Sequence, residues 1–403
     1  DAAFSVVHGG HQHALYASRQ GDGLGPLRVG PIEVAIEEPM RTLALRVATS
    51  HPGRVPLDAT RFLDRARAIL ARHAVGETGV YARWSLPGAD RAPNPYGASD
   101  AANLLYTLDE LPSGAATRAA WVAALRSWQE PETGLFREAT HDAIHTTAHC
   151  IAALELFDAL PAHRLSALAP LRDAGAMEAF LDALDWAGRP WTESHKGAGL
   201  YAALHLAGES SPEWEARYFG WLARECDPET GLWRRNAVPR GDASLGLLFP
   251  HLAGTFHYLF NCEHAGKAPP HPAALVATCE RIYARRVYPL ARFVSFAEID
   301  WVYCLHRAAR HCNRVDRVRP MLRDFAAEYL AFLDALDAVA RAHPEIPGAL
   351  RAAFERKDGD NVSPLGHALW MFVSDLFAAL VPVVPFALLP IDTARYVSIA
   401  CTA

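Results

Sequence analysis

The chain has 403 residues, of which 51% are hydrophobic and 21% charged, and its formal net charge is -6. This composition is typical of a soluble globular protein with a large core. The sequence contains no run of Lys or Arg and no basic helix face, which excludes the usual nucleic-acid-binding classes. We therefore expect a small-molecule or oligosaccharide ligand and no nucleic-acid partner.

The cysteines indicate the compartment. The seven cysteines are scattered, odd in number and include no Cys-x-x-Cys pair, a pattern that favours reduced thiols. No signal-like segment follows Asp1, and Pro382 and Pro385 interrupt the apolar stretch at 376–389, which is too short to span a membrane. We expect a cytoplasmic protein without a membrane span.

The first 55 residues differ from the rest of the chain. Residues 29–38 and 42–48 alternate apolar and polar side chains, as strands do. This pattern predicts a small N-terminal β-ribbon appendage over 1–55, followed by one large domain over 56–403.

Six apolar segments with a helical pattern each begin with polar residues. An ordinary amphipathic helix pattern separates each such segment from the next, and helix pairs repeated every roughly 40 to 50 residues indicate an array. The polar openings lie at residues 99–103, 145–149, 194–197, 251–257, 297–301 and 363–367.

The alternation predicts two layers of helices. The expected outer helices cover 60–75, 115–128, 174–187, 212–225, 271–285 and 315–341. The expected inner helices cover 98–111, 145–158, 195–206, 251–264, 297–311 and 363–380 and are apolar nearly all round, as enclosed helices are. No strand, helix, strand alternation follows residue 60. We predict an all-α fold, an (α/α)6 toroid of six inner and six outer helices.

One connection occurs twice. Pro-Glu-Thr-Gly-Leu followed by an aromatic residue stands at 131–136 and again at 228–233. Proline and glycine turn the chain there, and we expect a positive φ at Gly134 and Gly231. After each turn comes Thr-x-His, at 147–149 and 255–257. Two hairpins thus place a histidine near the start of an apolar helix.

These features resemble the six-hairpin (α/α)6 barrel superfamily, which includes unsaturated uronyl hydrolases, sugar 2-epimerases and several polysaccharide lyases. The resemblance covers nearly the whole chain after residue 60. Its most specific element is the repeated turn, which is informative for architecture and not for chemistry. Terpenoid cyclases and protein prenyltransferases share the toroid, so the fold alone assigns no function. No complete catalytic motif of one family is present, and no catalytic residues are carried over.

Asp300 and Glu298 are the first candidate catalytic carboxylates, because aromatic neighbours would desolvate them and raise their pKa toward that of a general acid. Two residues apart on a helix, they point roughly 200° away from each other, so only one can face a cavity. Asp100, at the first inner opening, is the expected second carboxylate. Helix capping or a buried ion pair is the alternative role for each.

Histidines recur at the same end of successive hairpins, which favours a site. His149 and His257 are the expected catalytic histidines, and His145, His195 and His367 the expected substrate-binding ones. His145 and His149 have the spacing of a metal-binding pair, but no acidic third ligand follows at a diagnostic distance, so we predict no metal and no cofactor. The alternative for each residue alone is a hydrogen-bonded wall position.

Parallel inner helices would collect their N-termini at one mouth, which favours an anionic ligand. In the loops at this mouth, Arg235 and Arg240 are the expected carboxylate-binding residues. Trp233, Trp301 and Tyr258 could stack on sugar rings, although aromatic residues at helical spacing are more often core.

Together these features predict a carbohydrate-active enzyme, a hydrolase, lyase or epimerase, acting on an acidic or uronate-containing sugar. One alternative is a terpenoid or other hydrophobic-substrate cyclase or isomerase, although the chain lacks the Asp-x-Asp-Asp and Asp-Asp-x-x-Asp motifs of the known classes. The other alternative is a non-catalytic ring that binds a glycan or a peptide.

Overall fold

A computed structural model of the chain describes residues 60–83, 92–241, 248–285 and 296–325, together with seven short strands between residues 2 and 48. Strands β1 (Ala2–His8) and β2 (His11–Ala17) form an antiparallel hairpin, and β3 (Arg19–Gln20) pairs with β4 (Gly23–Leu24). The strands β5 (Leu27–Val29), β6 (Ile32–Val34) and β7 (Val47–Ala48) form an antiparallel sheet in that order. A separate appendage over 1–55 stays a prediction, as does the single domain over 56–403.

Between residues 60 and 325 the named elements are all helices, as predicted for an all-α protein. Helical backbone also continues over 315–325, the described part of the expected outer helix at 315–341. The helices are α1 (Thr60–His73), α2 (Pro95–Thr107), α3 (Ala115–Arg126), α4 (Ala143–Glu155), the 3-10 helix η1 (Ser166–Arg172), α5 (Ala174–Asp182), α6 (Pro190–Leu206), α7 (Pro212–Glu225), α8 (Leu248–His264), α9 (Pro272–Arg285) and α10 (Phe296–His311).

The inner helices begin before their polar openings. Pro95 and Pro190 start α2 and α6, because proline suits the first helical position, where its missing N–H costs nothing. Asn94 caps α2 by accepting hydrogen bonds from two first-turn amides at 2.8 and 3.2 Å. Helix capping is the alternative role given above for Asp100, but Asn94 is the cap of α2. Asp100 lies in the second turn of the helix, and its side chain is buried.

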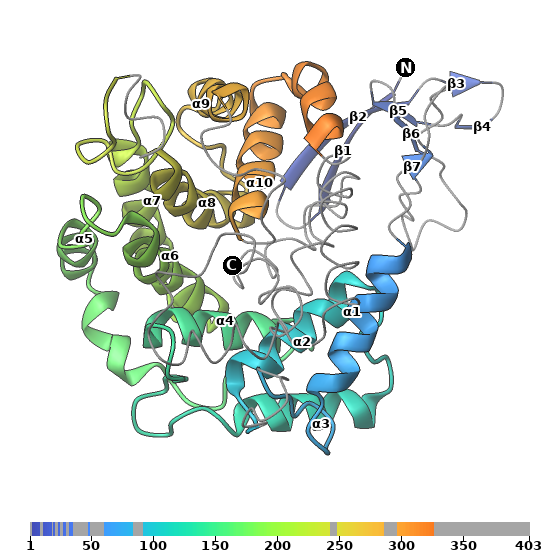
Figure 1. Ribbon diagram of the computed structural model, residues 1–403, viewed down its shortest axis with the longest axis vertical. Coiled ribbons are helices and arrows are strands. Elements are labelled where there is room, and N and C mark those ends of the chain that lie inside the picture. The colour runs from blue at the N-terminus through green and yellow to red at the C-terminus, as the bar shows by residue number, and fades with distance from the viewer. Residues whose placement is uncertain are drawn as a thin grey trace, which may run out of the picture.

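The inner helices α2, α4, α6, α8 and α10 pack in chain order, each against the next, around an arc (Figure 1). Tyr96 on α2 contacts His145 on α4, and four residues further along both helices Asp100 contacts His149. Both partners advance together, so neighbouring inner helices are parallel. Helices α6 and α8 show the same relation in two pairs, Ser194 with His257 and Ala198 with Asn261.

The remaining helices form a second layer on this row. Helix α1 packs on α2, α3 on α4 and α9 on α10, while α5 packs against α7. The expected sixth inner helix at 363–380 lies outside the described residues. Closure of the arc into a toroid of six hairpins thus stays a prediction.

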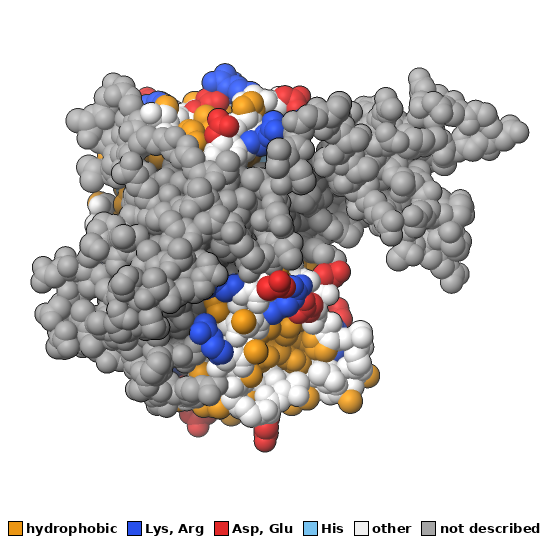
Figure 2. Space-filling view, turned by 45° about the vertical axis from the view of Figure 1, so that its right-hand side comes forward, with side chains coloured by type: hydrophobic (Ala, Val, Ile, Leu, Met, Phe, Trp, Pro, Cys, Tyr) orange, Lys and Arg blue, Asp and Glu red, His pale blue; other side chains and the backbone are white. Residues whose placement is uncertain are grey.

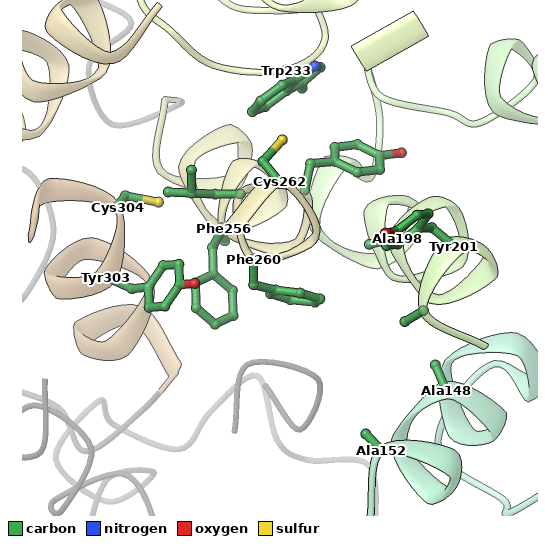
Figure 3. Packing of buried hydrophobic residues seen from close by; sticks show 14 of the residues in the cluster. Ala148, Ala152, Ala198, Tyr201, Trp233, Phe256, Phe260, Cys262, Tyr303 and Cys304 are labelled. Carbon is green, nitrogen blue, oxygen red and sulfur yellow. The ribbon is translucent and has the colours of Figure 1, made fainter. Parts of the chain in front are cut away.

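The core lies between the two layers and between successive inner helices. Phe256 on α8 and Tyr303 on α10 meet edge to face with ring centroids 5.2 Å apart, beside Phe260 and Cys304 (Figure 3). On the visible surface, charged side chains of both signs stand side by side (Figure 2), and the described ion pairs include Arg67 with Glu110 at 2.6 Å. Within the described helices none is long and apolar enough to cross a membrane.

The repeated turn has the same backbone hydrogen bonds in both copies. The Gly134 amide donates to the Glu130 carbonyl at 2.8 Å, and the Gly231 amide donates to the Asp227 carbonyl at 2.7 Å. The φ angles of the two glycines are 73° and 72°, which confirms the predicted positive values. A Cβ at Gly134 would lie 2.0 Å from the Arg164 carbonyl oxygen, so this turn also needs glycine for close approach.

We predict that Gly134→Ala destabilises the fold more than Gly208→Ala does. Gly208 has a φ of 68°, but a Cβ added there would meet no atom within 4 Å, so its substitution costs only backbone strain, about 1 kcal/mol. Gly134→Ala adds a clash with backbone, and such overpacking costs about 1 to 3 kcal/mol more. Urea denaturation of the two variants measures the difference, and equal midpoints would contradict this use of the turn.

Candidate functional site

Two hydrogen-bonded pairs join α2 to α4 near their N-terminal ends. The Tyr96 hydroxyl lies 2.9 Å from His145 Nε2, and Asp100 Oδ1 lies 3.0 Å from His149 Nε2. The pairs are four residues apart on both helices, a rise of about 6 Å along the helix axes. The structure thus brings together three of the predicted site residues and adds the hydroxyl of Tyr96, a residue that the sequence offered only as one of several aromatic rings that could stack on a sugar.

The Asp100–His149 pair is completely buried, with both side chains 0% exposed. An ionised carboxylate can only accept, so His149 donates from Nε2–H and keeps a lone pair on Nδ1. Within the described chain neither Nδ1 of His149 nor Oδ2 of Asp100 has a hydrogen-bond partner. Buried polar atoms without partners are costly, so this pair is one of several places in the described chain where a bound molecule could complete the hydrogen bonds.

Aromatic and charged groups surround Tyr96. Its ring stacks on His141 with centroids 4.2 Å apart and planes within 7°, and the Arg83 guanidinium carbon lies 4.7 Å from the ring centroid. Burial raises the pKa of the Tyr96 hydroxyl well above its usual value, and the charge of Asp100 raises it further. Tyr96 therefore keeps its proton and can act as a hydrogen-bond or proton donor.

Four histidines form a continuous row across three helices, which we call the histidine row: His141, His145, His195 and His257. Successive ring centroids lie 5.3, 4.2 and 4.2 Å apart, and the rings of His145 and His195 are stacked within 17°. Burial lowers the pKa of His145 and of His195 well below its usual value, and the neighbouring histidines lower it further. These two rings are neutral at neutral pH.

A small cavity lies between α4, α6 and α8. Its volume is about 10 Å³, space for about one water molecule. Small residues open the space and three rings of the histidine row border it. The lining residues are His145, Ala148, His195, Ala198, Gly199, Ala202, His257 and Phe260.

An acidic anchor stands at one end of the row. His141 Nδ1 lies 2.6 Å from Glu138 Oε1, and Arg83 Nη1 lies 3.7 Å from the other carboxylate oxygen. Burial acts to raise the pKa of Glu138, but hydrogen bonds from His141 and Thr140 outweigh it and lower the pKa to about 2. Glu138 is thus an anion that accepts a hydrogen bond from His141 and pairs with the Arg83 guanidinium.

His141 and Glu138 were not among the residues predicted from the sequence, yet a signal for His141 was present. His141, His145 and His149 are spaced by four residues, which places them along one side of a helix and its approach. The sequence prediction above names only the pair at 145 and 149. The pairing of Tyr96 with His145 carried no comparable pattern, because these residues are 49 positions apart and meet only through tertiary packing. Glu138 lies three residues before His141.

Several predicted substrate-binding residues lie in the packing between the layers. The indole N–H groups of Trp233 and Trp301 donate to the carbonyls of Leu222 and Cys279 at 2.7 and 3.0 Å. Both indoles are 0% exposed, as is Tyr258. The ring of Tyr258 stacks with that of Trp186 at 5.4 Å. These three aromatic side chains serve the core, the alternative that their helical spacing allowed.

The two predicted arginines lie in the loop after the second copy of the turn. Arg240 makes two hydrogen bonds with the Asp227 carboxylate, at 2.9 and 3.2 Å, and one with Glu229 at 2.8 Å. Arg235 is exposed, and its amide donates to the Glu225 carbonyl. The side chain of Arg240 is thus engaged by acidic groups of its own turn.

The remaining candidates belong to the fifth and sixth inner segments. Asp300 is 0% exposed in the second turn of α10, the inner helix that follows α8. Glu298 stands on the same helix, but its side chain lies outside the described residues, and so does His367. Their roles stay predictions.

The described residues do not provide a ready metal site. No group of three or more His, Cys, Asp or Glu side chains among them could hold a metal ion. His145 and His195 stack face to face, so their ring nitrogens do not converge on one point.

We predict that stability falls as the pH drops below about 6.5, the usual pKa of histidine. The unfolded chain then binds protons that the buried, neutral rings of His145 and His195 do not, because their folded-state pKa is lowered. The stabilisation is present above the unfolded pKa and is lost as the pH falls toward the folded one. Each such ring contributes up to about 1.4 kcal/mol per pH unit in this window.

The measurement is the free energy of unfolding in urea between about pH 5 and 7.5, the window that the histidine pKa defines. His195→Gln should flatten its slope against pH, whereas His163→Gln, a partly exposed position outside the row, should leave the slope unchanged. Equal slopes for His195→Gln and the unaltered protein would show that the row does not cause the pH dependence.

Comparison with known proteins gives one match. Residues 1–69 match a family of unknown function (DUF8625). No curated protein and no solved structure matches the chain at a significant level. The match covers the N-terminal strands and most of α1 and does not reach the histidine row.

Proposed function

We propose that this protein is an enzyme that transfers protons on an acidic, uronate-containing sugar. The observation that carries the proposal is the buried Asp100–His149 pair beside the Tyr96–His145 pair. One pair offers a base and the other offers an acid. The proposal extends the arc of inner helices to a closed (α/α)6 toroid with the site inside its mouth.

The two pairs suit proton transfer at carbon. His149, oriented through Nε2 by Asp100, has a lone pair on Nδ1 that can remove the proton next to a sugar carboxylate. Asp100 stabilises the imidazolium that forms. Tyr96, whose pKa burial raises, keeps a proton that it can give to a leaving oxygen or back to carbon. This chemistry needs no cofactor.

The side chains of the two pairs support a lyase or an epimerase better than a hydrolase. Glycoside hydrolysis ordinarily uses two carboxylates that flank the scissile bond. The two pairs between α2 and α4 contain one carboxylate, Asp100, and it is hydrogen-bonded to His149. Histidine and tyrosine dominate instead, and both are common groups for moving protons.

An acidic substrate fits the electrostatics of this end of the fold. Parallel inner helices point the positive ends of their dipoles to the same side of the fold, which favours an anion there. Arg83, 8% exposed, lies over the Tyr96 ring with Glu138 3.7 Å away, and a substrate carboxylate would share this guanidinium with Glu138. The neutral rings of His145 and His195 add uncharged hydrogen-bonding groups.

A ligand screen by thermal shift is the first experiment. Uronic acids and their oligomers are compared with the matching neutral sugars and with isoprenoids. A ligand at about 100 times its Kd should add about 2.7 kcal/mol of stability by mass action. A response to isoprenoids alone would replace the proposal with a cyclase, and a response to neutral and acidic glycans alike without turnover would indicate a binding ring.

For a ligand that is turned over, we predict that Asp100→Asn lowers the rate by about 10² to 10⁴. The amide keeps the shape of the carboxylate but cannot stabilise protonated His149. Incorporation of solvent deuterium at the carbon beside the carboxylate, followed by NMR, measures proton transfer directly, and the ultraviolet absorbance of an unsaturated product separates a lyase from an epimerase.

The matched control is His311→Gln. It breaks another carboxylate–histidine pair, Glu263 Oε1 with His311 Nε2 at 2.6 Å, which joins the C-terminal ends of α8 and α10. That variant should lose stability and keep its turnover per folded molecule. Full turnover in Asp100→Asn would refute the assignment of the acid–base pair.

A further inference from the structure

The Thr-x-His unit is built twice in the same way. The Thr147 hydroxyl oxygen accepts from the Phe136 amide at 2.9 Å, and that of Thr255 accepts from the Trp233 amide at 3.1 Å. Each hydroxyl donates to the carbonyl four residues earlier in its helix, at 2.6 and 2.8 Å. The repeated turn is thereby tied to the inner helix two residues before each histidine, so His149 and His257 stand at equivalent places on α4 and α8.

Each of these histidines is held by an oxygen on the preceding inner helix, but through different ring nitrogens. His149 meets Asp100 of α2 through Nε2 at 3.0 Å. His257 meets Ser194 of α6 through Nδ1 at 2.7 Å. The two Thr-x-His units therefore have the same backbone arrangement, but the histidine ring nitrogen that makes the hydrogen bond differs between them.

Counting protons assigns the tautomer of His257. The Ser194 hydroxyl has one proton, and its oxygen lies 2.6 Å from the Trp191 carbonyl, which can only accept. Buried serines in helices commonly donate to such a carbonyl of the preceding turn. Ser194 then accepts from His257, so the ring carries its proton on Nδ1 and a lone pair on Nε2.

We propose that Ser194 is the positioning residue of His257, which makes His149 and His257 two proton acceptors that present opposite ring nitrogens, Nδ1 and Nε2. This role of the pair rests on the proposed function. His257 borders the small cavity together with His145 and His195, on the side of the row away from His141. The site thus has a second accepting nitrogen on α8, in addition to the one that Asp100 prepares on α4.

The tautomer is measurable without any substrate. The full chain is labelled with ¹⁵N-histidine, and the spectra that link the ring carbon protons to both ring nitrogens identify which nitrogen is protonated. His257→Gln removes one set of signals and assigns it. We expect the Nδ1–H form for His257 in the unaltered protein at neutral pH, and the Nε2–H form would overturn the proposal.

Substitution of the serine tests its role. Ser194→Ala removes the acceptor of Nδ1–H, so the His257 signals should move toward the Nε2–H form, and Ser194→Thr, which keeps the hydroxyl, should restore the original pattern. Ser99→Ala is the matched control, because the Ser99 hydroxyl is also buried and donates to the carbonyl of Pro95 four residues earlier, away from His257. It should leave the His257 signals unchanged.

The outcomes separate this proposal from the proposed function. Unchanged His257 signals in folded Ser194→Ala would reject the positioning role, and if that variant does not fold, the tautomer of the unaltered protein still decides. The proposed function would be rejected if the protein turned over no acidic sugar. The positioning role would still stand if His257 showed the Nδ1–H form and its signals moved in Ser194→Ala.

Discussion

A polar side chain buried in the early turns of an inner helix must find a hydrogen-bond partner, and the rest of the structure depends on how this need is met. The cost of leaving such a group unpaired is about 1 to 3 kcal/mol. A buried hydroxyl can donate to a carbonyl of its own helix, as Ser194 does to Trp191, and the other hydrogen bonds are made with a side chain of the neighbouring inner helix. Tyr96 with His145, Asp100 with His149 and Ser194 with His257 all obey this rule. These bonds set the register between helices that apolar packing alone would allow to slide.

The same bonds determine where the histidine rings carry their protons. A carboxylate partner and a hydroxyl partner select different tautomers, because the first can only accept and the second has one proton to place. Burial then keeps His145 and His195 neutral by lowering the pKa of each, while it raises that of Tyr96. The parallel helices thus hold two neutral histidine rings and a protonated tyrosine close together.

The need to pair buried polar groups is met differently at the C-terminal ends of α8 and α10. Glu263 near the end of α8 receives His311 at 2.6 Å and Arg307 at 3.8 Å from α10. His306 is buried beside them, and burial, followed by the charges of Arg307 and Arg310, lowers its pKa to about 3. Acid and base pair directly here, which joins the helix ends. The Asp100–His149 pair, by contrast, lies near the middle of α2 and α4, and the cavity lies along α4, α6 and α8.

The sequence by itself determined the features that depend on residues close together in the chain. Helix positions followed from the spacing of apolar residues, and the positive φ of Gly134 and Gly231 followed from a turn that only glycine closes. Of the site, the sequence indicated Asp100, His145, His149, His195 and His257 by their place at the helix openings. Their partners were decided by the tertiary structure alone. His149 and Asp100 are 49 residues apart, and His257 and Ser194 are 63 apart. Trp233 and Trp301 show the same limit, because a periodic pattern places an aromatic residue on a helix without saying whether a cavity or a second helix layer covers it.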